Sequence, residues 1–163
     1  MHMLTVVPFV STQTRDVVDV ILPIQREFGI DVTIEQQPDL LDIPGFYQKG
    51  VGNFWVALVD DKVVGTIALL DIGRRQGALR KMFVRSEHRG ATAGVAKLLL
   101  ATLLAWCEDK ALREIYLGTT AKFLAAHRFY EKNGFVEIDK NLLPSAFPIM
   151  AVDTKFYTLT LNP

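Results

Sequence analysis

The chain of 163 residues has one cysteine, no formal net charge and no apolar run long enough to span a membrane. One cysteine cannot form an internal disulfide, and this fits a reducing compartment. The most apolar run, residues 98–107, has about half the length that a bilayer requires. The first residues also lack a basic region before an apolar stretch, which a secretory signal would have. We therefore expect a cytoplasmic protein in which Cys107 is a small buried hydrophobe.

The charge balance argues against another class of protein. Lysines and arginines together number 18, as do aspartates and glutamates. Nucleic-acid binders usually present a strongly basic surface, so this class is disfavoured, although Lys81, Arg85, His88 and Arg89 could form a local basic patch. Half of the chain is hydrophobic and no linker or repeat divides it. We expect residues 1–163 to form a single domain.

Hydrophobic periodicity predicts the order of the elements. It indicates helices at residues 15–28, 94–110 and 121–133, and strands at residues 4–10, 53–59, 62–70, 77–84, 114–118, 135–138 and 155–161. Pro23 predicts a kink or a break in the first helix. Residues 31–52 are expected to be a loop with at most a helical turn. The three strands of residues 53–84 should form an antiparallel meander, and the helix of residues 94–110 should connect two parallel strands. This order predicts an α/β fold of the α+β type, with a central mixed β-sheet flanked by helices on both faces.

Small residues separate the strand that ends near residue 84 from the next helix, in the stretch HRGATAGVAK of residues 88–97. A helix N-terminus exposes unpaired N–H groups and the positive end of the helix dipole, which together favour anions. Small residues at positions 90–94 would let phosphate oxygens reach those N–H groups, and Arg89 would add a charged contact. The loop alone leaves open a tight turn that binds nothing. It is neither a P-loop nor a dinucleotide-binding fingerprint.

Two stretches, LRKMFVRSEHRG at residues 79–90 and AAHRFYEKNGF at residues 125–135, resemble the GNAT superfamily of acyl-CoA-dependent N-acetyltransferases. The resemblance is strongest over residues 53–138. It implies a GNAT-like acyl-CoA N-acyltransferase fold that takes acetyl-CoA as co-substrate and needs no metal. The implied reaction moves the acetyl group to a primary amine of a small molecule, an amino-acid-like compound or a peptide. A non-catalytic acyl-CoA sensor or partner module of the same fold is the alternative. The expected partners are acetyl-CoA and the amine, without nucleic acid or membrane. The protein could also form a homodimer.

The resemblance also implies where acetyl-CoA binds, namely the end of the strand, the loop and the downstream helix. The implied cofactor-binding residues are Met82, Phe83, Val84, Arg89, Gly90, Ala91, Thr92, Ala93, Gly94, Val95, Ala96, Phe123 and Ala126. Ala91 stands where the family usually has Gln or Arg, and Phe123 stands where it often has Asn. We interpret the loop as lengthened, with Arg89 reaching back to the pyrophosphate.

Tyr130 is the expected proton donor to the CoA sulfur. Tyr130 could instead only pack on the core, and the two roles are compatible. A backbone N–H near Phe83 or Val84 would meet the thioester oxygen. His127 is expected to pack in the helix or lie at the surface and not to act as a base.

The general base is not identified by the sequence, which offers Asp71, Glu114 and Glu137 at strand ends without favouring one. The acceptor pocket is expected between residues 40–51 and 141–150. There Phe46, Tyr47, Leu143 and Phe147 could line it or simply pack on the core.

Overall fold

The structure, a computed structural model, describes residues 3–90 and 93–161. It contains a seven-stranded sheet in the order β1-β2-β3-β4-β5-β7-β6. Only β4 and β5 pair in parallel, so the expected mixed sheet is confirmed. The strands are β1 (Leu4–Pro8), β2 (Asn53–Val59), β3 (Lys62–Asp71), β4 (Gln76–Val84), β5 (Glu114–Thr119), β6 (Val136–Ile138) and β7 (Lys155–Thr160).

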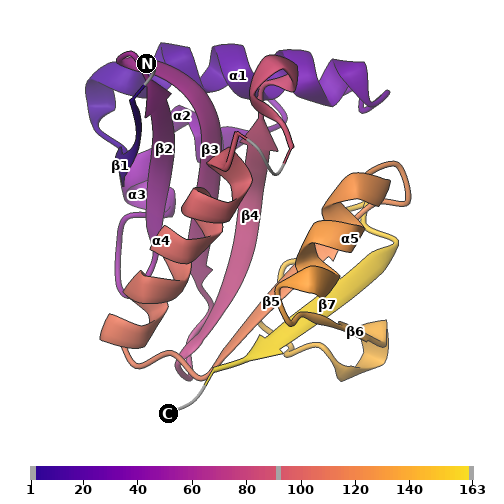
Figure 1. The fold of residues 1–163 in the computed structure, drawn as a ribbon. Coiled ribbons are helices and arrows are strands. Elements are labelled where there is room, and N and C mark those ends of the chain that lie inside the picture. The colour runs from indigo at the N-terminus through magenta and orange to yellow at the C-terminus, as the bar shows by residue number, and fades with distance from the viewer. Residues whose placement is uncertain (1–2, 91–92, 162–163) are drawn as a thin grey trace.

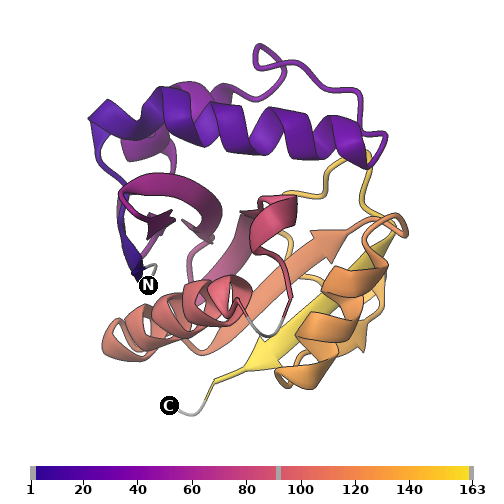
Figure 2. The ribbon, with the colours of Figure 1, turned by 45° about the horizontal axis from the view of Figure 1, so that its top comes forward.

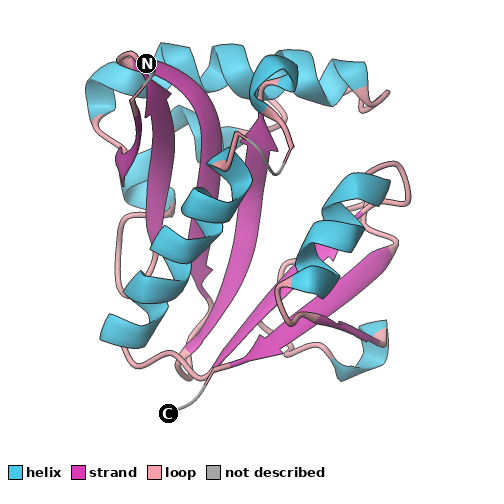
Figure 3. Ribbon diagram, viewed as in Figure 1, coloured by secondary structure: helices cyan, strands magenta, loops and turns pink. Residues whose placement is uncertain are grey.

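Helices cover both faces of the sheet, as expected. In the ribbon views α1 lies on one face, and α4 and α5 lie on the other (Figures 1, 2 and 3). Within the described part of the chain, no helix is long and apolar enough to cross a membrane. The helices are α1 (Thr14–Glu27), α2 (Pro38–Leu41), α3 (Ile43–Phe46), α4 (Val95–Asp109) and α5 (Leu124–Lys132), with short 3-10 turns η1 (Ser11–Gln13), η2 (Ser86–His88) and η3 (Lys140–Leu142).

Two local predictions need correction. Pro23 lies inside α1, which continues as one helix, so the predicted break is wrong. A proline inside a helix removes one backbone hydrogen bond. The buried stripe that includes Val17, Ile21 and Ile24 packs on the sheet and keeps the helix together despite that loss. Residues 31–52 contain two short helices where at most one turn was expected, and the Asp42 carboxylate caps α3 by accepting from the Gly45 N–H at 3.1 Å.

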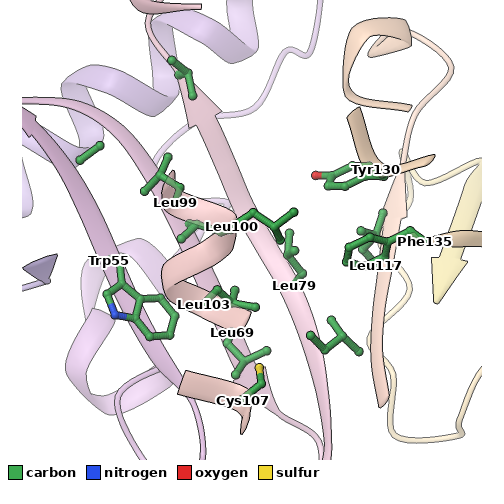
Figure 4. Close-up of a cluster of buried hydrophobic side chains, with 14 of the residues drawn as sticks. Trp55, Leu69, Leu79, Leu99, Leu100, Leu103, Cys107, Leu117, Tyr130 and Phe135 are labelled. Carbon is green, nitrogen blue, oxygen red and sulfur yellow. The ribbon is translucent and has the colours of Figure 1, made fainter. Parts of the chain in front are cut away.

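The core consists of layers on the two faces of the sheet. Because side chains alternate along a strand, Trp55 of β2 faces α4, whereas Phe54 packs in the layer beneath α1. Figure 4 shows α4 directing Leu103 and Cys107 into the first of these layers. Burial raises the pKa of the Cys107 thiol to about 12. The expectation that Cys107 is a buried small hydrophobe is therefore confirmed.

A β-bulge in β4 shapes the middle of the sheet. Thr66 and Ala68 are two positions apart on β3, but their partners Phe83 and Arg80 are three apart on β4, so β4 holds one extra residue. Lys81 adopts a φ of +52°, and its carbonyl accepts from the Thr66 hydroxyl at 2.7 Å. Bulges bend a strand and increase its twist. The bulge accounts for the divergence of β4 from β5.

The parallel pairing of β4 with β5 covers only Gln76–Ala78 of β4 and Glu114–Tyr116 of β5. Beyond these residues the two strands separate, and α5 lies on the β5 side of the opening (Figure 1). Past residue 78, β4 therefore presents a backbone edge that β5 does not cover. This is the edge on which the sequence places cofactor-binding residues.

Truncation of Leu103 tests the packing of α4. Leu103 is fully buried, whereas Leu98 of the same helix is 36% exposed. We expect Leu103→Ala to lower the free energy of unfolding by about 2–5 kcal/mol, because it leaves a cavity in the core. The matched control Leu98→Ala should change it by less than about 1 kcal/mol. Chemical denaturation of both variants measures the difference, and equal losses would contradict the assignment of the two faces of α4.

Candidate functional site

Two pockets meet where β4 and β5 diverge. The large pocket has a volume of about 600 Å³ and lies toward the N-terminus of α4. The small pocket has a volume of about 220 Å³ and lies toward the loop before β7. Both are lined by Met82, Phe83, Phe123, Ala126 and Tyr130. These five residues form the boundary across which two bound molecules could react.

The large pocket is positively charged. Its lining includes Arg89, Lys97, Arg128 and Lys132, and none of the described lining residues is an aspartate or a glutamate. The whole chain has no net charge, so these cations are concentrated at one place. Such a lining favours a ligand that carries several negative charges.

Two glycines shape the floor of the large pocket at the start of α4. Gly90 and Gly94 have φ values of +101° and +70°, which glycine adopts without strain. A Cβ built at either position would meet nothing within 4 Å, so the space above both backbones is open. The Gly94 N–H donates to the Gly90 carbonyl at 3.3 Å. Ala91 and Thr92, which the sequence also places in the site, lie outside the described residues.

Arg89 is held by the protein. Its Nη1 and Nη2 donate to the two Glu27 carboxylate oxygens at 2.8 and 2.9 Å, and its Nε donates to the Val84 carbonyl at 2.7 Å. Hydrogen bonding from Arg89 lowers the pKa of Glu27. The guanidinium also lies 5.3 Å from the centre of the Phe28 ring. Arg89 thus joins the end of α1 to the end of β4, and its contact with a pyrophosphate stays a prediction.

Most of the other predicted cofactor-binding residues lie together. Two of the predicted residues, Ala93 and Val95, line neither pocket. Ala93 is exposed to solvent, and the Val95 side chain on α4 is buried in the core. The predicted residues that line the large pocket beside Arg89 are Met82, Phe83, Val84, Gly90, Gly94, Ala96, Phe123 and Ala126.

Tyr130 is buried, and its hydroxyl points from α5 across the opening toward β4 (Figure 4). The hydroxyl donates to the Met82 sulfur at 3.6 Å, a weak hydrogen bond. Burial raises the pKa of Tyr130 well above its usual value. The phenol therefore keeps its proton at physiological pH, as a proton donor must.

His127 has a structural role. It is buried, and its Nε2 lies 2.9 Å from the Thr120 carbonyl oxygen, which ties the start of α5 to the end of β5. The expectation that His127 packs in the helix is confirmed.

The small pocket has different walls from those predicted. On one side its wall comes from the chain after α1, with Ile30 and Val32, and not from residues 40–51. Phe46 does not line it, and Tyr47 is fully buried in the layer beneath α1. The physical reason is that Leu40 of α2, Ile43 of α3 and Tyr47 just after α3 are buried in the layer beneath α1. Of the four residues predicted to line the acceptor pocket, Phe147 lines the small pocket. Leu143 does not line it but packs against the buried cluster that contains Phe147.

A buried polar network supports the bulge from below. The Lys81 Nζ donates to Gln37 Oε1 at 2.6 Å and lies 3.6 Å from Asp39 Oδ2, which accepts from the Tyr47 hydroxyl at 2.6 Å. Gln37 also exchanges hydrogen bonds with Gln25 of α1. Burial lowers the pKa of Lys81. Its side chain is only 11% exposed, so Lys81 is not part of a basic surface patch.

None of the three acids considered as general base lines either pocket. Asp71 accepts from the Val51 and Gly73 N–H groups, and the Glu137 carboxylate lies 3.7 Å from the Lys155 Nζ. Asp153 is the acid that lines the small pocket, and burial raises the pKa of its carboxyl. It lies in a loop without periodicity, so only its position just before the last strand could have indicated it.

The comparisons with known proteins agree with this geometry. An acetyltransferase of the GNAT family from Staphylococcus aureus Mu50 superposes with a TM-score of 0.93 at 36% identity, covering 98% of this chain and 100% of that one. N-acetyltransferase 8F1 of Rattus norvegicus is 31% identical over 121 residues, which are 71% of this chain and 54% of that protein. N-acetylaspartate synthetase of Xenopus tropicalis is 39% identical over 104 residues, or 61% of this chain and 37% of that protein.

The chain thus spans about half or less of the length of these two curated relatives. The family model described as "Acetyltransferase (GNAT) family" matches residues 21–135, which include β2 to β5, the loop at Gly94 and Tyr130. The match covers more than half of the chain, and it includes the β4 edge and the two glycines that shape the large pocket. The chain belongs to the GNAT acetyltransferase family.

Proposed function

We propose that this protein is an N-acetyltransferase that moves an acetyl group from acetyl-CoA to the primary amine of a small molecule, an amino-acid-like compound or a peptide. The observation that carries the proposal is the meeting of a cationic large pocket and a small pocket at Tyr130. The relative named N-acetylaspartate synthetase favours an amino-acid-like acceptor.

The large pocket suits acetyl-CoA. Lys97, Arg128 and Lys132 can neutralise the phosphates, whereas Arg89 is already paired with Glu27. The open space above Gly90 and Gly94 lets phosphate oxygens approach the N-terminus of α4. The edge of β4 past residue 78 can pair with the pantetheine arm as an added strand would. The thioester would then lie beside Phe83, at the boundary between the two pockets.

The chain offers a group for each proton and charge in acetyl transfer. The amine nitrogen bonds to the acetyl carbon, and the bond from that carbon to sulfur breaks. A backbone N–H of Phe83 or Val84 would stabilise the negative charge on the carbonyl oxygen. Tyr130 would give its proton to the departing thiolate, and Asp153 would accept the proton that the amine loses.

We propose that the protein acts in the cytoplasm. A single domain with one buried cysteine and balanced charge suits the cytoplasm. Acetyl-CoA and an amine would be its partners, in a monomer or a homodimer, without nucleic acid or membrane.

One observation favours the alternative of a non-catalytic acyl-CoA sensor. Phe123 lies where the family often has Asn, and its ring packs against Phe28 and Phe83 with centroids 4.8 and 6.4 Å apart. This contact puts an apolar wall where a polar cofactor contact would be. A sensor would bind acetyl-CoA and release no thiol with any amine, whereas the enzyme would release CoA thiol with at least one amine of a panel.

Charge at position 94 tests the cofactor site. Asn and Asp both tolerate the positive φ of Gly94, and both would extend into open space. We expect Gly94→Asp to weaken acetyl-CoA binding at least tenfold more than Gly94→Asn, because only the aspartate repels the phosphates. Isothermal titration gives both affinities. Equal losses of affinity in the two variants would contradict the proposal that the phosphates bind at this loop.

Removal of the Tyr130 hydroxyl tests the proton donor. Tyr130→Phe keeps the ring and loses only a weak hydrogen bond to Met82, so stability should change by less than about 1 kcal/mol. General acid catalysis contributes about 10²–10⁴ in rate. We expect near-normal acetyl-CoA binding with kcat at pH 7 reduced at least tenfold.

The pH dependence of this defect has a definite sign. The raised pKa keeps Tyr130 protonated in the wild type across the assay range, so its donor is present at every pH tested. A leaving thiolate with a pKa of about 8.5 needs no donor at high pH, so the defect should shrink above about pH 9. Tyr157→Phe is the control, because its hydroxyl belongs to the same aromatic cluster but lines neither pocket. A Tyr130→Phe variant with wild-type kcat would leave Tyr130 as a packing residue.

A further inference from the structure

We propose that the acceptor amine also carries a carboxylate, and that Arg80 binds this carboxylate in the small pocket. The inference rests on the proposed function, because it specifies which amines the small pocket accepts. It is argued from the contacts of Arg80, the charges around the pocket and the pocket's size.

Arg80 forms no ion pair with a described carboxylate, although its charge acts on the Asp153 carboxyl in the same pocket. It lies at the bulge of β4, is half-buried and lines the small pocket. Its Nη2 lies 3.8 Å from the Met150 sulfur, a weak acceptor, and its guanidinium carbon lies 5.7 and 5.9 Å from the ring centres of Phe46 and Tyr47. A guanidinium has five N–H donors, so most of them are available to a ligand.

The neighbouring cation, Lys81, is not available to bind a ligand carboxylate. Lys81 already lies against Asp39 and donates to Gln37. The rings beneath Arg80 hold its guanidinium plane through cation–π contacts, and this limits the freedom that the side chain would lose on binding. A planar, preorganised guanidinium matches the two oxygens of a carboxylate.

The small pocket also holds the opposite charge. Asp153 lines it, with Oδ2 accepting from the Met150 N–H at 3.0 Å, and its carboxylate forms no ion pair with Arg80. A guanidinium and a carboxylate held apart in one pocket complement a molecule that carries both an ammonium and a carboxylate. Asp153 would then face the amine, and Arg80 would fix the other end.

The dimensions of the pocket restrict the acceptor to a small molecule. About 220 Å³ is below the usual range for drug-sized ligands, which begins near 300 Å³. Ile30, Val32, Phe147 and Val152 give part of the lining an apolar character. These features together fit a free α-amino acid whose side chain packs on the apolar wall.

Matched pairs of acceptors test the inference. The pairs are L-phenylalanine with phenethylamine and L-leucine with isoamylamine, in which each second member lacks the carboxylate. We expect kcat/KM of the wild type to favour at least one amino acid over its partner by tenfold or more. Arg80→Gln should reduce kcat/KM for that amino acid at least tenfold and change it for the partner amine less than threefold.

Two further variants define the role of Arg80. Arg80→Lys keeps the charge without the planar fork and should recover part of the preference. Arg113→Gln is the matched control, because Arg113 is exposed and lines neither pocket. It should leave the preference unchanged. A uniform loss in Arg80→Gln for both members of the pair would overturn the proposal.

A binding measurement separates this inference from the proposed function. N-acetyl-L-phenylalanine and N-phenethylacetamide are titrated into the wild type and Arg80→Gln with CoA in excess. The inference is supported if the wild type binds the acid more tightly than the amide and Arg80→Gln loses this difference. This holds even if no amine is acetylated, and the absence of acetylation would then overturn only the proposed function. Acetylation of the plain amines without any preference for a carboxylate supports the function and overturns the inference. Failure of both turnover and acid binding overturns both.

Discussion

The bulge at Lys81 is the constraint on which the site depends. One extra residue in β4 bends the strand away from β5 after three paired positions, and the hydrogen bond from the Thr66 hydroxyl to the Lys81 carbonyl fixes where the bend occurs. The Lys81 side chain is anchored beneath the sheet by Gln37 and Asp39. The same distortion leaves part of the β4 edge uncovered by β5, forms the boundary between two pockets and brings Arg80 to one of them. A regular β4 paired fully with β5 would provide none of these features.

Charge is distributed unevenly around that boundary although the chain as a whole is neutral. The described lining of the large pocket has cations and no acids, whereas that of the small pocket includes two cations and the Asp153 carboxylate. Lys81 is neutralised within the protein by Asp39, so the small pocket presents Arg80 and Asp153 as its two open charges. The two sides therefore favour chemically different molecules, a polyanion on one and a small molecule of mixed charge on the other. An overall charge of zero conceals this arrangement.

Periodicity and local motifs were sufficient to predict the sheet, the main helices and most of the large pocket. The apolar run of residues 53–59 and the largely apolar helical pattern of residues 94–110 depend on neighbours in sequence, and the structure confirms both elements. The wall formed by Ile30 and Val32, the Lys81 network and the position of Asp153 depend on contacts between distant segments, which no local pattern encodes. Arg89 shows the same limit. Its position in the loop was evident, but its pairing with Glu27, 62 residues away, was not.

The burial of Tyr130 connects the stability of the fold with its chemistry. Its ring packs against Phe135 and Tyr157, with centroids 5.5 and 6.1 Å apart, so the hydroxyl is placed by the core and not by a mobile loop. The same burial raises the pKa of the phenol, which keeps the proton available for transfer. The Met82 sulfur is a weak partner for the hydroxyl, so little hydrogen-bond energy would be lost if the hydroxyl turned toward a thiolate as proposed. A strong acceptor at this position would hold the proton more firmly, so the packing of Tyr130 on α5 supplies position and protonation state without restraining the proposed proton transfer.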